Sequence, residues 1–99
     1  MPLGSNEIKM GFIATARVLV YEYVVEHLEK TNSKHKTFAL DEVYVVWFCK
    51  TLQNWKALIS TDLPDGMYYE VTYNGDTGDA YLDAYKKFDN KAIQIAPDF

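Results

Sequence analysis

Two histidines and one cysteine are the side chains best suited to acid–base, nucleophilic or metal chemistry, but their spacing favours none of these. His27 and His35 do not form a His-Glu-x-x-His zinc pattern, and both are interpreted as solvated residues. Cys49 is the only cysteine, which excludes a thiolate zinc cluster and an intrachain disulfide. It lies in the apolar run 43–49, where a thiol behaves as a small hydrophobic side chain. We therefore expect no catalytic residue, no metal site and no cofactor.

The segment 74–79, Asn-Gly-Asp-Thr-Gly-Asp, is the part of the chain most similar to a ligand-binding loop. Compared with a calcium-binding loop, it has Gly78 at the third ligand position and lacks the glutamate of the twelfth. The same residues are typical of a hairpin connection. The chain also lacks a phosphate-binding glycine loop and a nucleophile elbow. We therefore expect that the protein is not an enzyme.

The composition is that of a small folded domain with an acidic surface. The 99 residues are 48% apolar and 15% aromatic, and the formal net charge is -4. Residues 1–5 resemble the remnant of an expression vector, and residues 6–99 have the length of a single domain. Acidic residues dominate from Ala57 onward, which argues against a nucleic-acid binder. They form a solubilising surface or attract a basic protein partner.

The sequence pattern predicts neither a membrane protein nor a secreted one. The apolar run 43–49 is far shorter than the roughly 20 residues of a membrane span. The N-terminus lacks the basic and apolar regions of a signal peptide, and a single cysteine fits a reducing compartment. We expect a cytoplasmic protein that does not contact membranes.

One helix followed by several strands is predicted to carry these residues. Residues 6–30 form an amphipathic helix with a polar stripe and a broad apolar face. Val18, Tyr21 and Val25 widen that face beyond what one sheet covers. Such a face indicates either a helix clamped on two sides or a self-association surface. The polar residues 31–36 form a loop.

Residues 43–49 are predicted as a strand, because nearly every side chain in this run is β-branched or aromatic. Apolar side chains on both faces are typical of a central strand that is covered on both sides. A buried helix is the alternative. Residues 55–60 form the hairpin partner of this strand, and Trp47 is predicted to lie in the core. A Pro-Asp-Gly turn that ends at Gly66 follows.

Residues 67–73 are predicted as a third strand and residues 81–88 as a fourth, although the apolar spacing of the fourth also fits a helix. The Asn-Gly-Asp connection before it favours a hairpin. Residues 92–95 are expected to add a short edge strand. The predicted fold class is α+β, with a long N-terminal helix packed on an antiparallel β-meander of three to four strands.

The candidate interaction surface combines the helix with the tryptophan hairpin. Trp55 is adjacent to a turn, where it either packs internally or lines an interface. Two tyrosines near the ends of the third strand have the same two possibilities. The residues of this candidate surface are Val18, Tyr21, Val25, Asn54, Trp55, Tyr68 and Tyr73.

Three segments, residues 46–57, 65–74 and 81–87, resemble a family of small uncharacterised proteins encoded by phages and prophages of Gram-positive bacteria, such as streptococci and lactobacilli. The likeness extends from about Gly11 to Phe88. It implies a context, a bacterial cytoplasm during phage infection or lysogeny. It implies no catalytic residue and no ligand.

The expected function is that of a non-enzymatic phage accessory protein, a homo-oligomer that binds a host factor or a defence component. The alternative is a module that sequesters a small molecule such as a nucleotide-like signal by stacking it on aromatic rings. The scarcity of lysine after Ala57 argues against this alternative. A further alternative, an acidic mimic of nucleic acid, requires Asp76, Asp79 and Asp83 to share one face.

Overall fold

The structure is a computed structural model that describes residues 11–30 and 38–96. The first residues of the predicted helix, the predicted loop 31–36 and His35 lie outside the described residues. The elements are α1 (Phe12–Lys30), η1 (Leu40–Glu42), β2 (Val43–Thr51), β3 (Asn54–Thr61), β4 (Met67–Asn74) and β5 (Asp79–Lys86).

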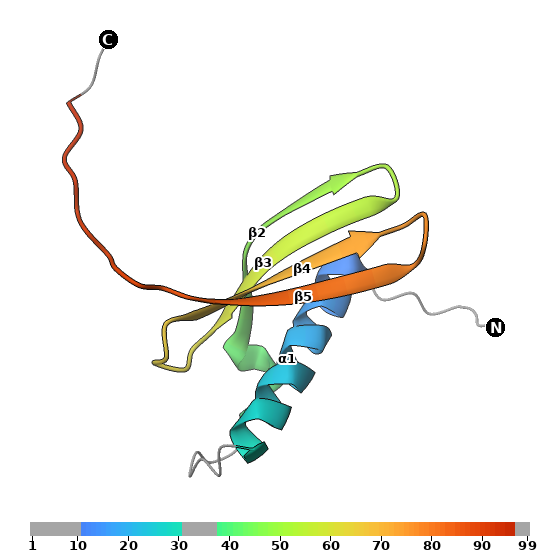
Figure 1. The fold of residues 1–99 in the computed structure, drawn as a ribbon, viewed down its shortest axis with the longest axis horizontal. Coiled ribbons are helices and arrows are strands. Elements are labelled where there is room, and N and C mark those ends of the chain that lie inside the picture. Colours follow the sequence, from blue (N-terminus) through green and yellow to red (C-terminus); the bar gives the residue numbers. More distant parts are fainter. Residues whose placement is uncertain (1–10, 31–37, 97–99) are drawn as a thin grey trace.

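The four strands form an antiparallel meander in the order β2-β3-β4-β5, and α1 lies across one face of this sheet (Figure 1). The predicted α+β fold, a helix packed on an antiparallel meander, is therefore confirmed. The segment with ambiguous spacing, 81–88, belongs to a strand as far as Lys86. It is held as a strand because β5 pairs with β4 along its whole length, from Asn74 opposite Asp79 to Met67 opposite Lys86.

The core lies between α1 and the inner face of the sheet. Ala16, Val20 and Val24 follow one another at helical spacing and are buried on α1. They pack on strand residues that alternate with outward-pointing ones. Burial raises the pKa of Tyr69 to about 12, so this core phenol is neutral at neutral pH. The buried apolar residues of β3 and β4 are Trp55, Ala57, Ile59, Tyr69 and Val71.

The residues that precede β2 cover a second side of the helix. The ring of Phe38 stacks on Tyr21 with 5.7 Å between ring centres. Arg17 donates two hydrogen bonds of 2.9 Å, one to the backbone oxygen of Leu40 and one to that of Val43. The broad apolar face of α1 is thus that of a helix clamped on two sides.

β2 is an edge strand, so the prediction of a central strand covered on both sides is wrong. In a meander the first strand has a neighbour on one side only. The register with β3 shifts between Val45 and Trp47, which is a β-bulge. Beyond the bulge, Trp47 is 44% exposed and Cys49 is exposed. The predictions of a core position for Trp47 and of an apolar environment for Cys49 are therefore wrong.

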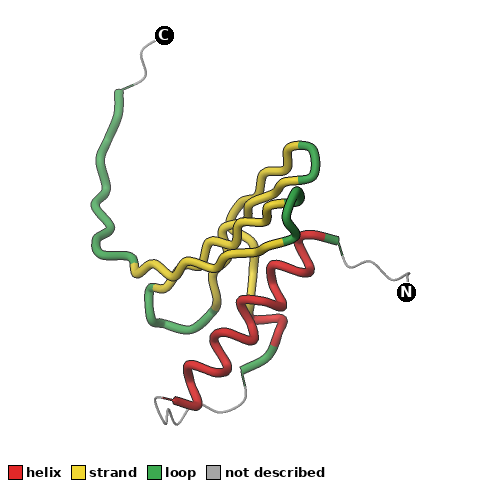
Figure 2. Tube along the Cα trace, turned by 45° about the vertical axis from the view of Figure 1, so that its right-hand side comes forward, coloured by secondary structure: helices red, strands yellow, loops and turns green. Residues whose placement is uncertain are grey.

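Residues 88–96 extend away from the end of β5 and are here called the arm (Figure 1, Figure 2). Lys87 still bonds to the domain, because its N–H donates to the carbonyl of Gly66 at 2.7 Å. Within the described residues, the arm has one hydrogen bond, from the N–H of Asn90 to the carboxylate of Asp89. The edge strand predicted at 92–95 is therefore wrong for this chain taken alone, because no sheet edge lies beside it.

Candidate interaction surface

The face of the sheet opposite α1 has no other element over it in the described part of the chain (Figure 1, Figure 2). Side chains alternate along each strand, so the residues between the buried ones point outward on this side. We call this surface the open face. Its residues are Tyr44, Trp47 and Cys49 of β2, Lys56, Leu58 and Ser60 of β3, Tyr68, Glu70 and Thr72 of β4, and Tyr81, Asp83 and Tyr85 of β5.

The open face is aromatic along both of its outer strands. On β2, Tyr44 is 45% exposed and Trp47 is 44% exposed. On β5, Tyr81 is 59% exposed and Tyr85 is 51% exposed. Soluble monomers seldom gather large uncovered rings on one face, and tyrosine and tryptophan are enriched where proteins bind one another. This face is therefore the strongest candidate for a binding surface among the described residues.

The middle strands of the open face carry two charged side chains, Lys56 and Glu70, and these are paired. The Nζ of Lys56 lies 3.5 Å from the carboxylate of Glu70. Tyr85 donates a hydrogen bond of 3.4 Å to the same carboxylate, and the negative charge of Glu70 is the main cause that raises the pKa of Tyr85. The Nζ of Lys87 lies 5.9 Å from the ring centre of Tyr68. Both lysines already interact with this sheet, which argues against a phosphate ligand.

A shallow hollow of about 490 Å³ lies beside the turn between β2 and β3. Trp47, Cys49 and Lys56 contribute to its lining, together with Trp55 and Tyr73. Trp55 and Tyr73 stack on each other with 5.3 Å between ring centres, so their facing sides are not available to a ligand. The hollow therefore offers one freely exposed ring, that of Trp47.

The predicted surface residues of the hairpin region face inward or make local contacts. Trp55 is 8% exposed, and its ring lies 5.4 Å from that of Phe12 and 5.3 Å from that of Tyr73. Tyr73 is half-buried beside it. The side-chain oxygen of Asn54 accepts a hydrogen bond of 2.8 Å from the N–H of Gly75. Of the two possibilities left open for Trp55, the structure shows internal packing.

The predicted helix residues lie on the other side of the molecule from the open face. Tyr21 stacks on Phe38, Val25 packs against the core, and Val18 is half-buried. Of the seven predicted residues, Tyr68 belongs to the open face and Asn54 lies at its turn end. The structure therefore does not bring the seven together as one surface.

The two tyrosines of β5 on the open face, Tyr81 and Tyr85, were missed by the sequence reasoning, as was Tyr44 of β2. A signal for them was present, because both alternate with smaller residues along β5. A single helix can cover one face of a four-stranded sheet, so the outward residues of every strand were candidates. The predicted surface was instead assigned from the broad apolar face of the helix and from proximity to turns.

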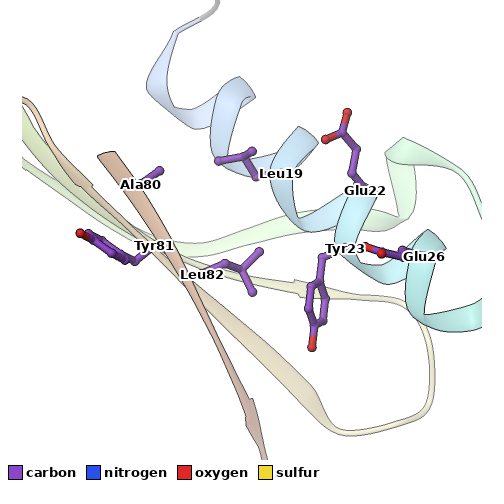
Figure 3. Close-up of a pocket in the computed structure, with 7 residues that line it drawn as sticks. All are labelled: Leu19, Glu22, Tyr23, Glu26, Ala80, Tyr81 and Leu82. Carbon is purple, nitrogen blue, oxygen red and sulfur yellow. The ribbon is translucent and has the colours of Figure 1, made fainter. Parts of the chain in front are cut away.

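A groove of about 290 Å³ separates α1 from β5 on the helix side of the sheet, and we call it the α1–β5 groove (Figure 3). Leu19 and Tyr23 of the helix and Leu82 of the strand give it an apolar lining. Glu22 and Glu26 also line it, from the helix. The groove is open because α1 packs mainly on β2, β3 and β4.

Residues with catalytic potential are dispersed. The ring of His27 stacks on Tyr23 of α1 at 5.7 Å, whereas Cys49 lies on the open face, so the sheet separates the two. In the ranges 11–30 and 38–96, no group of three or more His, Cys, Asp or Glu is placed to hold a metal ion. No helix in these ranges is long and apolar enough to cross a membrane.

Comparison with known proteins gives one match. No curated protein and no solved structure matches the chain significantly. The model of a family of unknown function, DUF6275, matches residues 13–95. This range includes nearly all of α1, the four strands and the arm as far as Ile95. The chain therefore belongs to the family of unknown function DUF6275.

Proposed function

We propose that this chain is a non-enzymatic accessory protein of a phage or prophage, and that it forms a homo-oligomer in the bacterial cytoplasm. It acts by binding another protein, either a host factor or a component of a defence system. The phage context rests on the resemblance of residues 46–57, 65–74 and 81–87. The observation that carries the binding role is the open face, with its uncovered rings on both outer strands.

The size of the open face is adequate for a protein partner. Large aromatic side chains bury roughly 150–250 Å² each. Since about half of each of the four rings is still exposed, together they add roughly 400 Å² toward the roughly 800 Å² that one partner contributes to a stable interface. The formal charge of -4 favours a neutral or basic protein over a nucleic acid.

Replacement of two open-face rings, Trp47→Ser with Tyr81→Ser, is expected to weaken partner binding at least about tenfold. Both rings are about half exposed, so the fold is expected to persist. The measurement is affinity capture from the lysate of a Gram-positive host such as a streptococcus, followed by titration of the captured protein. Leu52→Asn is the matched control, because Leu52 is 78% exposed in the β2–β3 turn and its φ of 56° suits asparagine.

Two results are expected from that experiment if the open face is the binding surface. Wild type and the Leu52→Asn control must retain the same protein at similar levels, and the double variant must lose it. Equal retention by the double variant would show that the open face is not the binding surface. Capture of background proteins alone by the wild-type chain would contradict the binding role itself.

The second candidate function is the sequestration of a small molecule such as a nucleotide-like signal in the hollow beside the β2–β3 turn. Its volume of about 490 Å³ lies within the usual range of ligand sites. A ligand present at a hundred times its Kd stabilises a protein by about 2.7 kcal/mol, which raises the Tm of a domain of this size by roughly 10–20 °C. A thermal-shift screen with cyclic and linear nucleotides is expected to show this shift, and Trp47→Ala to remove it. A flat response to every nucleotide excludes this candidate.

A further inference from the structure

We infer that the arm of one copy of this chain binds along the free edge of β5 in a second copy, so that two copies exchange arms in a symmetric dimer. The inference specifies the homo-oligomer named in the proposed function and depends on it. Its contacts are the edge of β5 and the side of that strand that faces away from α1. The partner-binding role also uses the rings of β2 at the opposite edge of the sheet, so the two roles can fail independently.

The arm has the properties of a strand that lacks a partner. It is extended, and its apolar side chains face water, with Phe88 100% exposed, Ile93 70% and Ile95 82%. Ile93 and Ile95 are two residues apart, so they point to the same side of an extended chain. Backbone donors and acceptors of the arm have no partner strand in the described chain. If the arm pairs with the edge of a sheet, its backbone groups gain hydrogen-bond partners and its apolar side chains are partly covered.

β5 provides a sheet edge of suitable length. It is the last strand of the sheet, so the backbone groups on its outer side have no neighbouring strand within the described residues. It has eight residues, and the arm, 88–96, is long enough to lie along all of them. The arm cannot pair with its own β5 without reversing direction, and it instead runs away from the sheet (Figure 1, Figure 2).

The position of the arm directly after β5 makes the exchange symmetric. Two copies that pair antiparallel about a two-fold axis near residues 87–88 place each arm on the β5 of the other copy. The same two-fold rotation thus pairs both arms with both β5 edges, so the interface is closed and no β5 edge is left for a third copy. The two sheets then join into one continuous antiparallel sheet through the paired β5 strands and arms.

Two-fold symmetry limits the register of this pairing. Residues directly opposite in an antiparallel pair point to the same face. A two-fold axis perpendicular to the sheet leaves each residue on its own face, so odd-numbered residues of the arm lie opposite odd-numbered residues of β5. With the axis at Lys87, Ile93 of one copy lies opposite Tyr81 of the other. Tyr81 points away from the helix (Figure 3), so Ile93 covers part of an exposed ring at the β5 edge of the open face.

The charges agree with the same register, because it places Lys91 of one copy opposite Asp83 of the other. Opposite charges across a strand pair stabilise it. An apolar and a charged position of the arm thus match β5 at one alignment.

The mass of the protein in solution tests the exchange. Light scattering is expected to show the wild-type chain at twice the 11.4 kDa of one copy. Ile93→Asp with Ile95→Asp is expected to run as a single copy with an unchanged circular dichroism spectrum, because these side chains are largely exposed in the described monomer. Leu52→Asp, a charge at an equally exposed apolar position, is the control and is expected to remain dimeric.

A disulfide tests the register. In a Cys49→Ser background, Ala80→Cys with Gln94→Cys is expected to form a dimer linked by disulfides on a non-reducing gel, since opposed strand residues are within bonding distance. Ala84→Cys with Gln94→Cys is the displaced control and is expected to remain unlinked.

Three results would overturn the inference: a wild-type mass of one copy, a dimer that survives the double aspartate variant, or an Ala80→Cys with Gln94→Cys variant that does not link. The second result would indicate another self-contact, such as pairing between β2 edges. A wild-type chain that is dimeric and captures no partner contradicts the partner-binding role alone. A wild-type chain that captures a partner and has the mass of one copy contradicts the arm exchange alone.

Discussion

Trp55→Ala is expected to lower the free energy of unfolding by about 3–5 kcal/mol, whereas Trp47→Ala is expected to lower it by about 1 kcal/mol or less. Trp55 is 8% exposed and its ring packs between those of Tyr73 and Phe12, at 5.3 Å and 5.4 Å. Its removal leaves a cavity between α1 and the sheet. Trp47 is 44% exposed on the open face, where water fills the space. Urea unfolding followed by circular dichroism measures both losses.

Single-tryptophan variants provide an independent control. Trp47→Ala leaves Trp55 as the one tryptophan, and Trp55→Phe leaves Trp47. The native tryptophan emission of the first variant is expected at a shorter wavelength than that of the second. Trp55→Phe retains an aromatic ring beside Tyr73 and is expected to cost less than Trp55→Ala. Equal stability losses for the two alanine variants, or the reverse order, would mean that the two rings are not on opposite faces of the sheet.

The different environments of the two tryptophans could not be predicted from their spacing. Side chains alternate along a strand, so Trp47 was expected to share the buried face of Val43 and Val45. The bulge between Val45 and Trp47 shifts this alternation by one residue. Phe48 consequently points to the helix side, where its ring meets that of Phe12 at 5.4 Å. A bulge depends on pairing with β3 and has no signature in the sequence of β2.

The strands and their connections were predictable because turn chemistry is local. Gly66 and Gly78 have φ values of 69° and 81°, a region that glycine enters without strain. The side chain of Asp65 accepts a hydrogen bond of 3.1 Å from the N–H of Met67, which closes the turn before β4. Such residues mark the ends of strands whatever the rest of the chain does. The meander and its α+β class follow from them.

The place of each strand in the sheet is a non-local property, and there the sequence reasoning was wrong for β2. Its apolar side chains on both faces are typical of a central strand. Chain order nevertheless places it at the edge of the meander. Rings that the pattern assigned to the core are therefore uncovered, which is why Trp47 was absent from the predicted surface. The same mismatch between apolar pattern and exposure now identifies the open face.

Gly75→Ala is expected to lower the free energy of unfolding by about 1–3 kcal/mol. A Cβ at Gly75 would overlap the carbonyl oxygen of Gln53 and would lie 2.6 Å from its Cβ. The two hairpin tips meet here, because Asn54 accepts a hydrogen bond from the N–H of Gly75 and Gln53 donates one to Asp76. A methyl group would separate these tips and break both hydrogen bonds. The measurement is urea unfolding with the midpoint and slope compared to wild type.

Two further variants separate steric overlap from backbone strain. Gly78→Ala has open space around its Cβ, so its cost, about 1 kcal/mol, comes from the φ of 81° alone. Gln53→Gly removes side-chain atoms near Gly75 and leaves the carbonyl oxygen in place, so a double-mutant cycle is expected to show partial rescue of Gly75→Ala. A neutral Gly75→Ala, or complete rescue by Gln53→Gly, would mean that the backbones of the two tips are not in contact. Partial rescue instead indicates that this glycine allows the β2–β3 and β4–β5 turns to pack together at one end of the sheet.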